Sequence, residues 1–362
     1  MGIRVLQVVT YMGRGGLETM IMNYYRHMDR KKIQFDFLVH RDFQADYDNE
    51  ILELGGKIYH VPQLNPFSPG YFKALDNFFS EHHYNIVHSH LDCLSAYPLK
   101  AAAKYDVSTR IAHAHNTDQD HNMKYLIKLY SKRKIPRYAT DLFACSERAG
   151  NWMFPGHKFQ VIKNAIDAGK YTYNSEIEQS MKRELKIENK FVMGHVGRFA
   201  PQKNHDFLLD IFQSVVGLAE NAVLLLAGIG DGQAAIKDKV VKLGLEDKVI
   251  FLGNRLDVAK TLQAMDVFVF PSHYEGFSLA AVEAQAAGLP CIFSDQIPRE
   301  CALTENVEFI SLHMPPREWA NRIIRYKGNK KKNEYAAICS AGYNIKDNAK
   351  QLEEFYLSRG SK

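Results

Sequence analysis

The sequence predicts an α/β protein made of two successive domains, each organised around a doubly wound parallel sheet. In the first half, short apolar runs typical of buried strands alternate with amphipathic stretches typical of helices. The same alternation begins again at Phe191–His195 and continues through the second half. A length of 362 residues is enough for two such domains, each with its own core.

The first half is expected to form an N-terminal domain over residues 1–168. Its first strand is Ile3–Val9, and a glycine-rich turn leads into a helix at Leu17–Met28. The further strands expected in this half are Phe35–His40, Lys57–Val61, Ile86–Ser89, Arg110–His113, Leu142–Cys145 and a closing strand around Val161–Ile162.

The second half is expected to form a C-terminal domain over residues 169–344. Its predicted strands are Phe191–His195, Val223–Ala227, Val249–Leu252, Val267–Val269, Cys291–Phe293 and Phe309–Ile310. Its predicted helices include Asn204–Gly217, Val258–Met265 and Ser278–Ala287. The last element, Ile345–Leu357, has the pattern of a single amphipathic helix.

Composition excludes several classes of protein. With 46% hydrophobic residues and 46 basic against 41 acidic side chains, the chain is not of the disordered type. The five cysteines include no CxxC pair, which argues for a reducing compartment and against a disulfide framework or a structural zinc site. No run approaches the roughly 18 apolar residues of a membrane span, and no signal peptide is recognisable. We therefore expect a cytoplasmic protein.

The segment Glu275–Glu283 carries two glutamates, one on the loop after a strand and one inside a helix. Gly276 allows a ligand to approach the backbone, and Ser278 is expected to cap the helix, whose first N–H groups then face the loop. Ionised carboxylates only accept hydrogen bonds, which suits a ligand rich in hydroxyls, such as a ribose and a sugar ring. The alternative is a pair of ordinary helix-face and solvated glutamates.

A second cluster, Gly197–Asn204, lies where the strand Phe191–Val196 ends and the next helix begins. Arg198 offers a planar fork of donors, and Lys203 offers a compact positive charge. Because both lie on a loop at the carboxyl end of a strand, they are well suited to a diphosphate. The alternative is a basic surface turn.

Two glycine-rich loops also follow predicted strands. Gly13–Glu18 supplies N–H groups at a helix start, notably at Gly15 and Gly16, and suits a phosphate or a sugar held against the backbone. It lacks the third glycine of a dinucleotide fingerprint and the lysine of a P-loop. The loop Ala227–Gly232 is for the same reason only a weak look-alike of a nicotinamide site.

Histidines at the end of a first-half strand could bind a metal or a ligand hydroxyl. His113 and His115 point to one face of the strand, and Asp118–Asp120 resembles a manganese-binding acidic pair. Because no third matched carboxylate or cysteine lies nearby, we expect no metal. We expect His115 to bond a ligand hydroxyl and His113 to be a core residue, with His88 and His90 as structural residues at a strand end.

Taken together, these motifs resemble glycosyltransferase family 4, the retaining nucleotide-sugar transferases with the GT-B fold. The resemblance covers nearly the whole chain, and GRxxxxKN combined with the spaced glutamates is more specific than either motif alone. It implies two Rossmann-like domains facing a cleft, with residues 345–362 packing back on the N-terminal domain. The sequences at His113–Asn116 and Glu275–Pro290 are similar to those of bacterial capsule and exopolysaccharide transferases.

The resemblance implies a role for each motif residue. Arg198 and Lys203 would bind the donor diphosphate, Glu275 the hydroxyls of the donor sugar, Glu283 the ribose, and His115 would lie beside the reacting sugar. The other implied donor contacts are Gly15, Gly16, Asn254 or Arg255 near the base, and the backbone N–H groups of Phe277, Ser278 and Leu279. Many members have glycine where this chain has Ala165, which leaves the hinge contact less defined.

The implied reaction moves a hexose-type sugar from a nucleoside diphosphate, expected to be UDP, to a glycan or lipid-linked acceptor. The anomeric configuration is retained, and no metal or other cofactor is expected. Alternatives are a non-catalytic scaffold that binds nucleotide sugars, a sugar-nucleotide epimerase with the same fold, and a nicotinamide enzyme. The last lacks its fingerprint in both halves.

The net charge of +5 lies entirely in the first half, where residues 1–170 carry 22 basic and 17 acidic side chains. Its densest part contains no acid and comprises Lys124, Lys128, Lys132, Arg133, Lys134 and Arg137, interleaved with apolar residues. One interpretation is a solvated basic helix face. The other is an amphipathic helix that docks on the anionic inner face of the plasma membrane and finds a lipid-linked acceptor there. Nothing else supports binding of nucleic acid.

Overall fold

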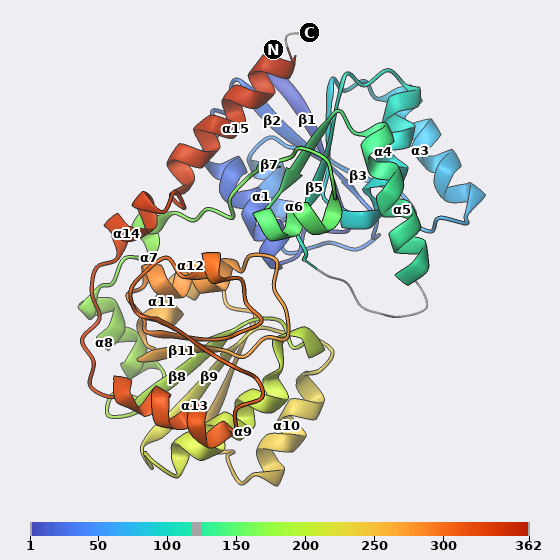
Figure 1. Cartoon of the computed structure of the whole chain (residues 1–362). Coiled ribbons are helices and arrows are strands. Elements are labelled where there is room, and N and C mark those ends of the chain that lie inside the picture. Colours follow the sequence, from blue (N-terminus) through green and yellow to red (C-terminus); the bar gives the residue numbers. More distant parts are fainter. Residues whose placement is uncertain (1, 118–124, 361–362) are drawn as a thin grey trace. The chain divides into compact units, whose positions relative to one another are not determined.

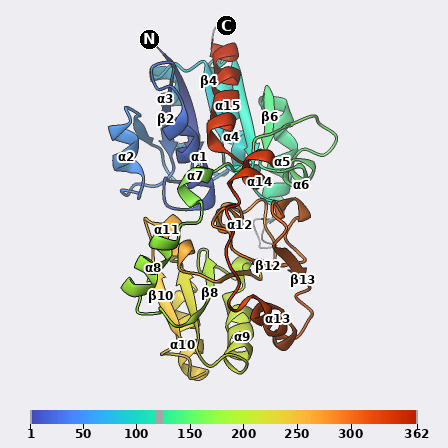
Figure 2. The same cartoon turned by 90° about the vertical axis from the view of Figure 1, so that its left-hand side faces the viewer.

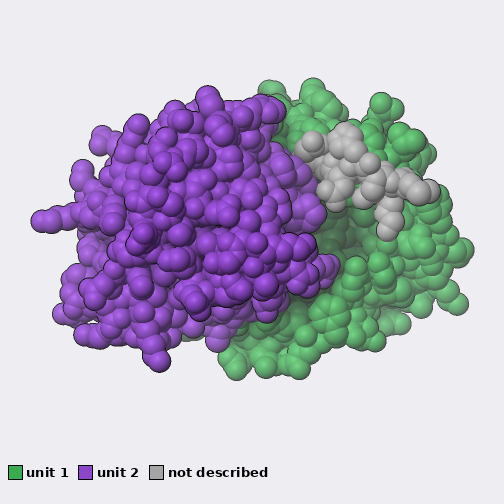
Figure 3. All heavy atoms as spheres, turned by 90° about the horizontal axis from the view of Figure 1, so that it is seen from below, with its two compact units in different colours: residues 1–165, 345–362 green, residues 166–344 purple. Residues whose placement is uncertain are grey.

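The computed structural model describes residues 2–117 and 125–360, which form two compact units (Figure 3). Unit 1 combines residues 1–165 with residues 345–362, and unit 2 comprises residues 166–344. The chain therefore passes from unit 1 to unit 2 and returns to unit 1 for its last helix. The predicted acidic segment Asp118–Asp120 lies outside the described residues.

Unit 1 contains a parallel sheet with the strand order β3-β2-β1-β4-β5-β6-β7 in its described part (Figure 1). Its strands are β1 (Ile3–Val9), β2 (Ile33–Val39), β3 (Ile58–His60), β4 (Ile86–Ser89), β5 (Thr109–Ala114), β6 (Asp141–Ala144) and β7 (Gln160–Val161). In this order, β2 and β3 lie on one side of β1, and β4 to β7 lie on the other side. The loops after β1 and β4 therefore diverge at the carboxyl edge, which is where doubly wound sheets bind ligands.

Helices cover both faces of this sheet. They are α1 (Gly16–His27), α2 (Asp48–Glu53), α3 (Pro69–Glu81), α4 (Ala96–Lys104), α5 (Tyr125–Tyr138) and α6 (Glu147–Met153), with a short 3₁₀ helix η1 (Asp92–Ser95). Helices α3, α4 and α5 pack in succession, and right-handed crossovers place them on the face opposite α1.

The C-terminal helix α15 (Ile345–Gly360) belongs to unit 1 and packs beside α1 over β1, β2 and β4 (Figure 2). Its buried residues Ile345, Ala349, Leu352 and Tyr356 recur at helical spacing, so one apolar stripe faces the sheet. This confirms the expected return of the C-terminal helix to the N-terminal domain.

Unit 2 contains a second parallel sheet with the order β10-β9-β8-β11-β12-β13 in its described part. Its strands are β8 (Phe191–Val196), β9 (Ala222–Ala227), β10 (Val249–Gly253), β11 (Val267–Phe270), β12 (Cys291–Ser294) and β13 (Val307–Ile310). All six residues of β9 are buried, which is typical of a central strand covered on both faces.

The helices of unit 2 again form two layers. They are α7 (Ala168–Tyr171), α8 (Ser175–Glu184), α9 (His205–Val216), α10 (Gln233–Lys242), α11 (Val258–Gln263), α12 (Leu279–Ala286), α13 (Pro316–Ile323) and α14 (Tyr335–Ser340). Helix α9 packs against α10 and α13, and the fully buried Trp319 of α13 lies in the same core cluster. Helices α7, α8, α11, α12 and α14 contact one another in the other layer.

The predicted fold class is confirmed, and the ends of the predicted strands and helices differ from the observed ends by at most three residues. All five cysteines are free thiols. In the described residues, no helix combines the length and the apolar character that crossing a membrane requires.

Candidate active site

The predicted diphosphate and sugar motifs lie at the carboxyl edge of the unit 2 sheet. Gly197–Asn204 follows β8, and the loop leading to Glu275 follows β11, the strand next to β8. The chain order of the strands reverses between these two neighbours. Both motifs therefore lie at the topological switch point, the usual ligand position in such sheets.

Lys203 and Glu275 form an ion pair at this point. The Lys203 ammonium lies 2.7 Å from Oε1 of Glu275, and the exposed fractions of the two side chains are only 16% and 7%. The same ammonium lies 4.7 Å from the ring centroid of Phe270. The sequence predicted a cation and an acceptor, but it did not predict that they would pair with each other.

Further hydrogen bonds join the two loops. The side-chain amide of Gln202 donates to the carbonyl of Tyr274 at 2.9 Å, and the N–H of His273 donates to the carbonyl of Gln202 at 2.9 Å. Asn204, which has a left-handed backbone with φ of 55°, donates from its side chain to the carbonyl of Pro271 at 3.1 Å. The two motifs are thus one hydrogen-bonded structure.

The glycine-rich loop after β9 supports the loop that carries Arg198. Gly228 and Gly230 have φ values of +143° and +157°, and a Cβ at either position would collide with the backbone of Gly197 or Phe199. The N–H of Phe199 donates to the carbonyl of Ile229 at 3.0 Å. These glycines are therefore explained by close packing of two backbone segments. Their spacing resembles that of a nucleotide-binding loop for this structural reason.

Arg198 differs from Lys203 in its surroundings. Arg198 is exposed, and its guanidinium forms no ion pair with a carboxylate of residues 2–117 or 125–360. Because a guanidinium forms bidentate bonds to phosphate, an exposed and uncompensated Arg198 suits an incoming anion.

Glu283 lies on α12 with only 6% of its residue exposed. The hydroxyl of Tyr171 donates to its Oε1 at 2.6 Å. Burial raises the pKa of Glu283, and the bonds from Tyr171 and the nearby Lys170 charge act against that rise. The sequence did not identify Tyr171 as its partner.

Ser278 is the N-cap residue of α12, at the predicted position. Its side chain makes no capping hydrogen bond. The following residues Leu279, Ala281 and Val282 are buried, so packing of an apolar first turn holds the start of α12. Phe277 stacks on Tyr343 with ring centroids 4.8 Å apart.

The predicted base-binding residues follow β10. Arg255 donates to both carboxylate oxygens of Asp257 at 2.7 and 2.8 Å, and its guanidinium also lies 3.5 Å from Glu184. These partners raise the pKa of Arg255, chiefly through the bond to Asp257. Asn254 is exposed beside it. The carbonyl of Gly253 accepts from Gly228, which connects this loop to the glycine loop after β9.

In unit 1, the glycine loop after β1 leads into α1. Gly15 is the N-cap residue, with φ of −82° and ψ of 169°. A Cβ at Gly16 would meet open space, whereas a Cβ at Gly15 would meet the carboxylate of Glu18. The backbone at Gly16 is therefore open to a ligand.

His115 is held by two partners at the carboxyl edge of the unit 1 sheet. The backbone N–H of His115 donates to Oδ1 of Asp92 at 2.8 Å, and the side chain of Asn116 donates to Oδ2 of Asp92. Nε2 of His115 bonds Nδ1 of His90 at 2.9 Å, while Nε2 of His90 bonds the side-chain oxygen Oε1 of Gln7 at 2.8 Å. Because this oxygen only accepts, neutral His90 carries its proton on Nε2, and its Nδ1 is an acceptor. His115 therefore donates to His90 from its own Nε2, which leaves Nδ1 of His115 as an acceptor.

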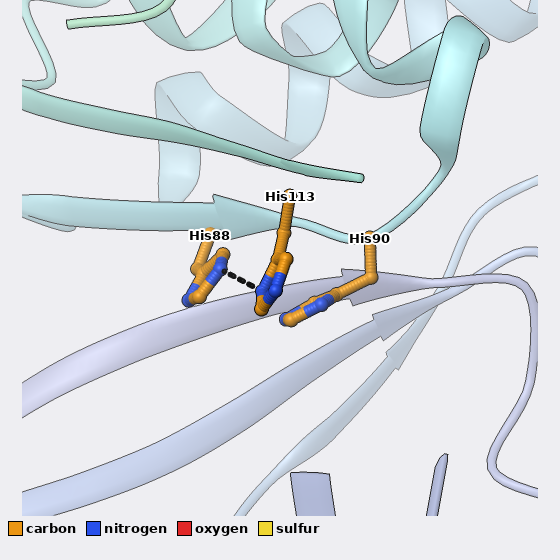
Figure 4. A group of neighbouring side chains, drawn as sticks. All are labelled: His88, His90 and His113. Carbon is orange, nitrogen blue, oxygen red and sulfur yellow. Dashed lines mark hydrogen bonds between the residues drawn. The ribbon is translucent and has the colours of Figure 1, made fainter. Parts of the chain in front are cut away.

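His88, His90 and His113 lie stacked in the core of unit 1 (Figure 4). Nε2 of His88 bonds Nδ1 of His113 at 3.1 Å, and Nδ1 of His88 bonds the hydroxyl of Tyr356 at 2.7 Å. Burial lowers the pKa of each of these three rings well below its usual value, and it lowers the pKa of His115 to about 3. All four imidazoles are therefore neutral at physiological pH.

The three stacked rings each place one nitrogen within 4.8 Å of the others, a spacing that could suit a metal ion. A three-histidine site needs lone pairs that converge on one point. Here the rings of His88 and His113 are nearly parallel, at 12°, and the facing nitrogens already share hydrogen bonds (Figure 4). This arrangement fits a stack of neutral imidazoles rather than a metal centre.

The predicted basic helix is α5, whose 14 residues include no acid. Lys132 donates to the carbonyl of Trp152 at 2.5 Å and lies 4.3 Å from the ring centroid, so it belongs to the structure of unit 1. Arg133 and Arg137 are exposed, and Lys128 and Lys134 are half-buried. Lys124 lies outside the described residues.

Comparisons with known proteins agree with these motifs. The family model for glycosyl transferases group 1 matches residues 176–342, and the model for glycosyltransferase family 4 matches residues 14–170. EpsF of Bacillus subtilis (strain 168), named as a glycosyltransferase, is 35% identical over 98% of this chain and 96% of its own length. CapH of Staphylococcus aureus, a capsular polysaccharide biosynthesis glycosyltransferase, is 25% identical over 99% of both chains.

Two further proteins are similar to this chain. A UDP-Gal:α-D-GlcNAc-diphosphoundecaprenol α-1,3-galactosyltransferase of Escherichia coli is 28% identical over 55% of this chain and 54% of its own. The crystal structure of Anabaena HepE with UDP and glucose superposes with a TM-score of 0.82, covering 98% of this chain and 99% of that one at 18% identity. The latter similarity establishes the shared fold.

Proposed function

Because the chain belongs to glycosyltransferase family 4, a retaining family, we propose that it transfers a hexose-type sugar from a UDP-sugar to a lipid-linked or glycan acceptor in surface polysaccharide synthesis. The observation that carries this proposal is the ion pair of Lys203 with Glu275, which joins a phosphate motif and a sugar motif at the switch point. The names of CapH and the E. coli galactosyltransferase support the polysaccharide setting and the UDP-linked donor.

The donor would bind along the carboxyl edge of the unit 2 sheet. Arg198 and Lys203 would bind the diphosphate, and Glu275 would accept hydrogen bonds from hydroxyls of the sugar. Glu283 would accept from the ribose. The remaining donor contacts would come from Asn254 or Arg255 and from the backbone N–H groups of Phe277, Ser278 and Leu279 at the start of α12. The roles of Gly15, Gly16 and His115 in unit 1 remain predictions.

The transfer would proceed through an oxocarbenium-like state. The bond between the anomeric carbon and the donor phosphate oxygen breaks, and the acceptor oxygen bonds to the same face of that carbon. A phosphate oxygen of the departing UDP takes the acceptor proton. Each cation that stabilises this diphosphate would contribute about 3 kcal/mol, which is a rate factor on the order of one hundred.

Neutral His115 would act by hydrogen bonding. Its Nδ1 can accept a bond from a sugar hydroxyl, and its low pKa prevents it from serving as a cationic acid near pH 7. The two cations would supply the charge stabilisation that a metal ion provides in other transferases. EDTA should therefore leave transfer unchanged, and loss of transfer that manganese restores would contradict this mechanism.

The direct test replaces the proposed phosphate ligands. Arg198→Ala should reduce turnover about a hundredfold, with a melting temperature close to that of the parent protein. Lys203→Ala should reduce turnover as strongly and should also lower the melting temperature, because it leaves the buried Glu275 without its ion-pair partner. Lys242→Ala, an exposed lysine at the end of α10, is the matched control and should retain full activity. Full activity in both site variants would refute the assignment.

The acceptor dependence separates transfer from the alternatives. A transferase should release UDP from its sugar donor in proportion to added acceptor. A sugar-nucleotide epimerase would convert the donor without an acceptor, and a scaffold would bind it without turnover. A thermal-shift panel of UDP-linked glucose, galactose and N-acetylglucosamine would identify the donor, because a tight ligand stabilises the folded state by mass action.

The lipid-linked class of acceptor is supported by the basic helix α5 and by the name of the E. coli relative. An anionic surface attracts each nearby basic residue by about 1 kcal/mol, so Lys128, Arg133, Lys134 and Arg137 together would give reversible attachment. Sedimentation with vesicles should increase with their content of anionic lipid and decrease with salt. Sedimentation that depends on neither anionic lipid nor salt would indicate that α5 is an ordinary solvated helix.

A further inference from the structure

A groove of 450 Å³ lies within unit 1, between the segment before α3 and the helices α4 and α5. This volume lies in the range of about 300–1,000 Å³ that is usual for small-molecule sites. Its lining is mostly apolar and aromatic, with two lysines. Of the residues that line it, only Lys134 has a role in the proposed function, in membrane attachment.

Helix α5 contributes one continuous stripe to the groove. Leu126, Tyr130, Lys134 and Tyr138 recur every four residues, so they lie on one face of the helix, and all four line the groove. The adjacent side of α5 holds the fully buried Ser131 and Ile135. The helix therefore has one face for the core of unit 1 and a second apolar face that the core does not cover.

The exposure of this second face is unusual for apolar side chains. Leu126 is 75% exposed and Tyr130 is 60% exposed, and across the groove Phe67 is 73% exposed. Single exposed apolar residues are common, but three that line one groove mark a site for an apolar partner.

The floor of the groove is fixed by packing and hydrogen bonding. The hydroxyls of Tyr97 and Ser131 lie 2.7 Å apart, which joins α4 to α5. The rings of Phe72 and Tyr97 lie 6.0 Å apart, which joins α3 to α4. The groove thus has a rigid aromatic floor and exposed apolar walls, and binding there would require little ordering of the protein.

The charges beside the groove select an anionic ligand. Lys100 and Lys134 line it, and the Lys134 ammonium lies 4.0 Å from the ring centroid of Tyr130. Its lining contains no acidic side chain, and neither does α5. The complementary ligand is an apolar chain that carries a phosphate or diphosphate group.

We propose that this groove binds the polyprenyl chain of a lipid-linked acceptor. The isoprene units next to the diphosphate would lie against Leu126, Tyr130 and Phe67, and the diphosphate would contact Lys100 and Lys134. The groove holds only a few isoprene units, so the rest of a long chain stays in the bilayer. This inference rests on the lipid-linked acceptor proposed above.

Two residues that line the groove lie at the starts of the helices that follow β4 and β5 in the chain. Asp92 of η1 accepts the N–H of His115, and η1 leads directly into α4, whose first residue Ala96 lines the groove. Leu126 is at the start of α5, the helix that follows β5 and His115 in the chain.

The test measures binding of farnesyl diphosphate, which has three isoprene units and a diphosphate, to the full chain by calorimetry. Saturating UDP is added so that the proposed donor site is already occupied. Farnesyl diphosphate should bind at least about tenfold more tightly than inorganic diphosphate, because only the former has a chain to bury. Equal affinities would overturn the proposal.

Variants locate the binding. Leu126→Gln and Tyr130→Gln should each weaken farnesyl diphosphate about tenfold, since each removes apolar contact from the chain. Leu52→Gln is the matched control, because Leu52 is an exposed apolar residue of unit 1, at 56%, outside the groove. Parent-like affinity in both groove variants would overturn the proposal. So would a groove variant that weakens sedimentation with anionic vesicles but not binding of farnesyl diphosphate, because α5 would then contact bilayers in general.

The transferase proposal fails by a different measurement. If the parent protein neither binds a UDP-sugar nor releases UDP with any acceptor, the proposed function is wrong whatever farnesyl diphosphate does. If the groove proposal holds, Leu126→Gln should raise KM for a prenyl diphosphate-linked acceptor about tenfold. It should leave KM unchanged for the same sugar on a short water-soluble aglycone. An equal effect on both acceptors would overturn the groove proposal alone.

Discussion

The ammonium of Lys203 lies 2.7 Å from Oε1 of Glu275, so each partner is already paired before any donor binds. Both side chains are largely buried, and the pair joins segments that lie 72 residues apart in the chain. A diphosphate that binds here must share Lys203 with Glu275 or displace it. The pair therefore sets a cost on nucleotide binding that an exposed lysine would not have.

Glu275→Gln should relieve this competition. The amide keeps the size of the side chain but removes its charge, so Lys203 becomes available to the diphosphate. We expect UDP to bind several-fold more tightly while turnover of the UDP-sugar falls about tenfold or more, because the sugar loses a charged acceptor. Calorimetry with UDP and steady-state kinetics measure the two effects. Weaker binding of UDP to this variant would contradict competition for Lys203.

Tyr171→Phe should destabilise unit 2 and weaken nucleotide binding. It removes the 2.6 Å hydrogen bond to Glu283, whose carboxylate is buried. A hydrogen bond to a charged group contributes about 1.5–3 kcal/mol, so chemical denaturation should show a loss of that order.

The coupling between Tyr171 and Glu283 is measured in the background Glu283→Gln. There, Tyr171→Phe should cost clearly less, because the amide does not leave a buried charge without its donor. Equal costs in both backgrounds would show that the hydroxyl does not act through Glu283.

The histidine stack should make unit 1 sensitive to mild acid. Burial depresses the pKa of His88, His90 and His113 in the folded state, whereas histidines of the unfolded chain titrate near their ordinary pKa of about 6.5. Below that pH the unfolded chain binds more protons than the folded chain, so stability falls as the pH decreases from about 6.5.

Urea unfolding at pH 7.5 and pH 5.0, followed by a probe in unit 1, measures this loss. His88→Gln should reduce the dependence on pH, and His157→Gln, which changes an exposed histidine of the same unit, should not. Equal stability of the parent protein at both values would contradict the assignment of neutral, buried imidazoles.

Asp92→Asn should lower turnover through the position of His115. Asp92 has φ of 46°, a conformation that asparagine also tolerates, so the backbone should be preserved. Its carboxylate accepts from both His115 and Asn116, and the amide would place an N–H group opposite one of these donors. We expect kcat to fall about tenfold with little change in the KM for the donor. A change confined to that KM would argue against positioning of His115.

Some features of this protein could be predicted from local sequence. The strand–helix alternation predicts both sheets because most strands are apolar runs of four to seven residues bounded by turns. Helix α15 is evident from apolar residues at helical spacing. Arg198 and Glu275 are candidate site residues because they are charged residues on loops that follow buried strands.

Other features depend on contacts between distant segments. The pairs formed by Lys203 with Glu275 and by Tyr171 with Glu283 join residues 72 and 112 positions apart, so no local pattern records them. Helical periodicity shows that α5 is basic, but it does not show that Lys132 contacts Trp152. Ser278 fits the pattern of a cap, yet packing of the apolar residues after it holds the helix start.

The return of α15 to unit 1 has a consequence for synthesis of the protein on the ribosome. Residues 166–344 form a contiguous unit and can fold as soon as they emerge, whereas residues 1–165 must wait for the last 18 residues. Until then α15 does not cover the surface over β1, β2 and β4, and His88 lacks its hydrogen-bond partner Tyr356. The N-terminal unit is therefore completed last, and truncation of the final helix should leave its apolar surface exposed to chaperones and proteases.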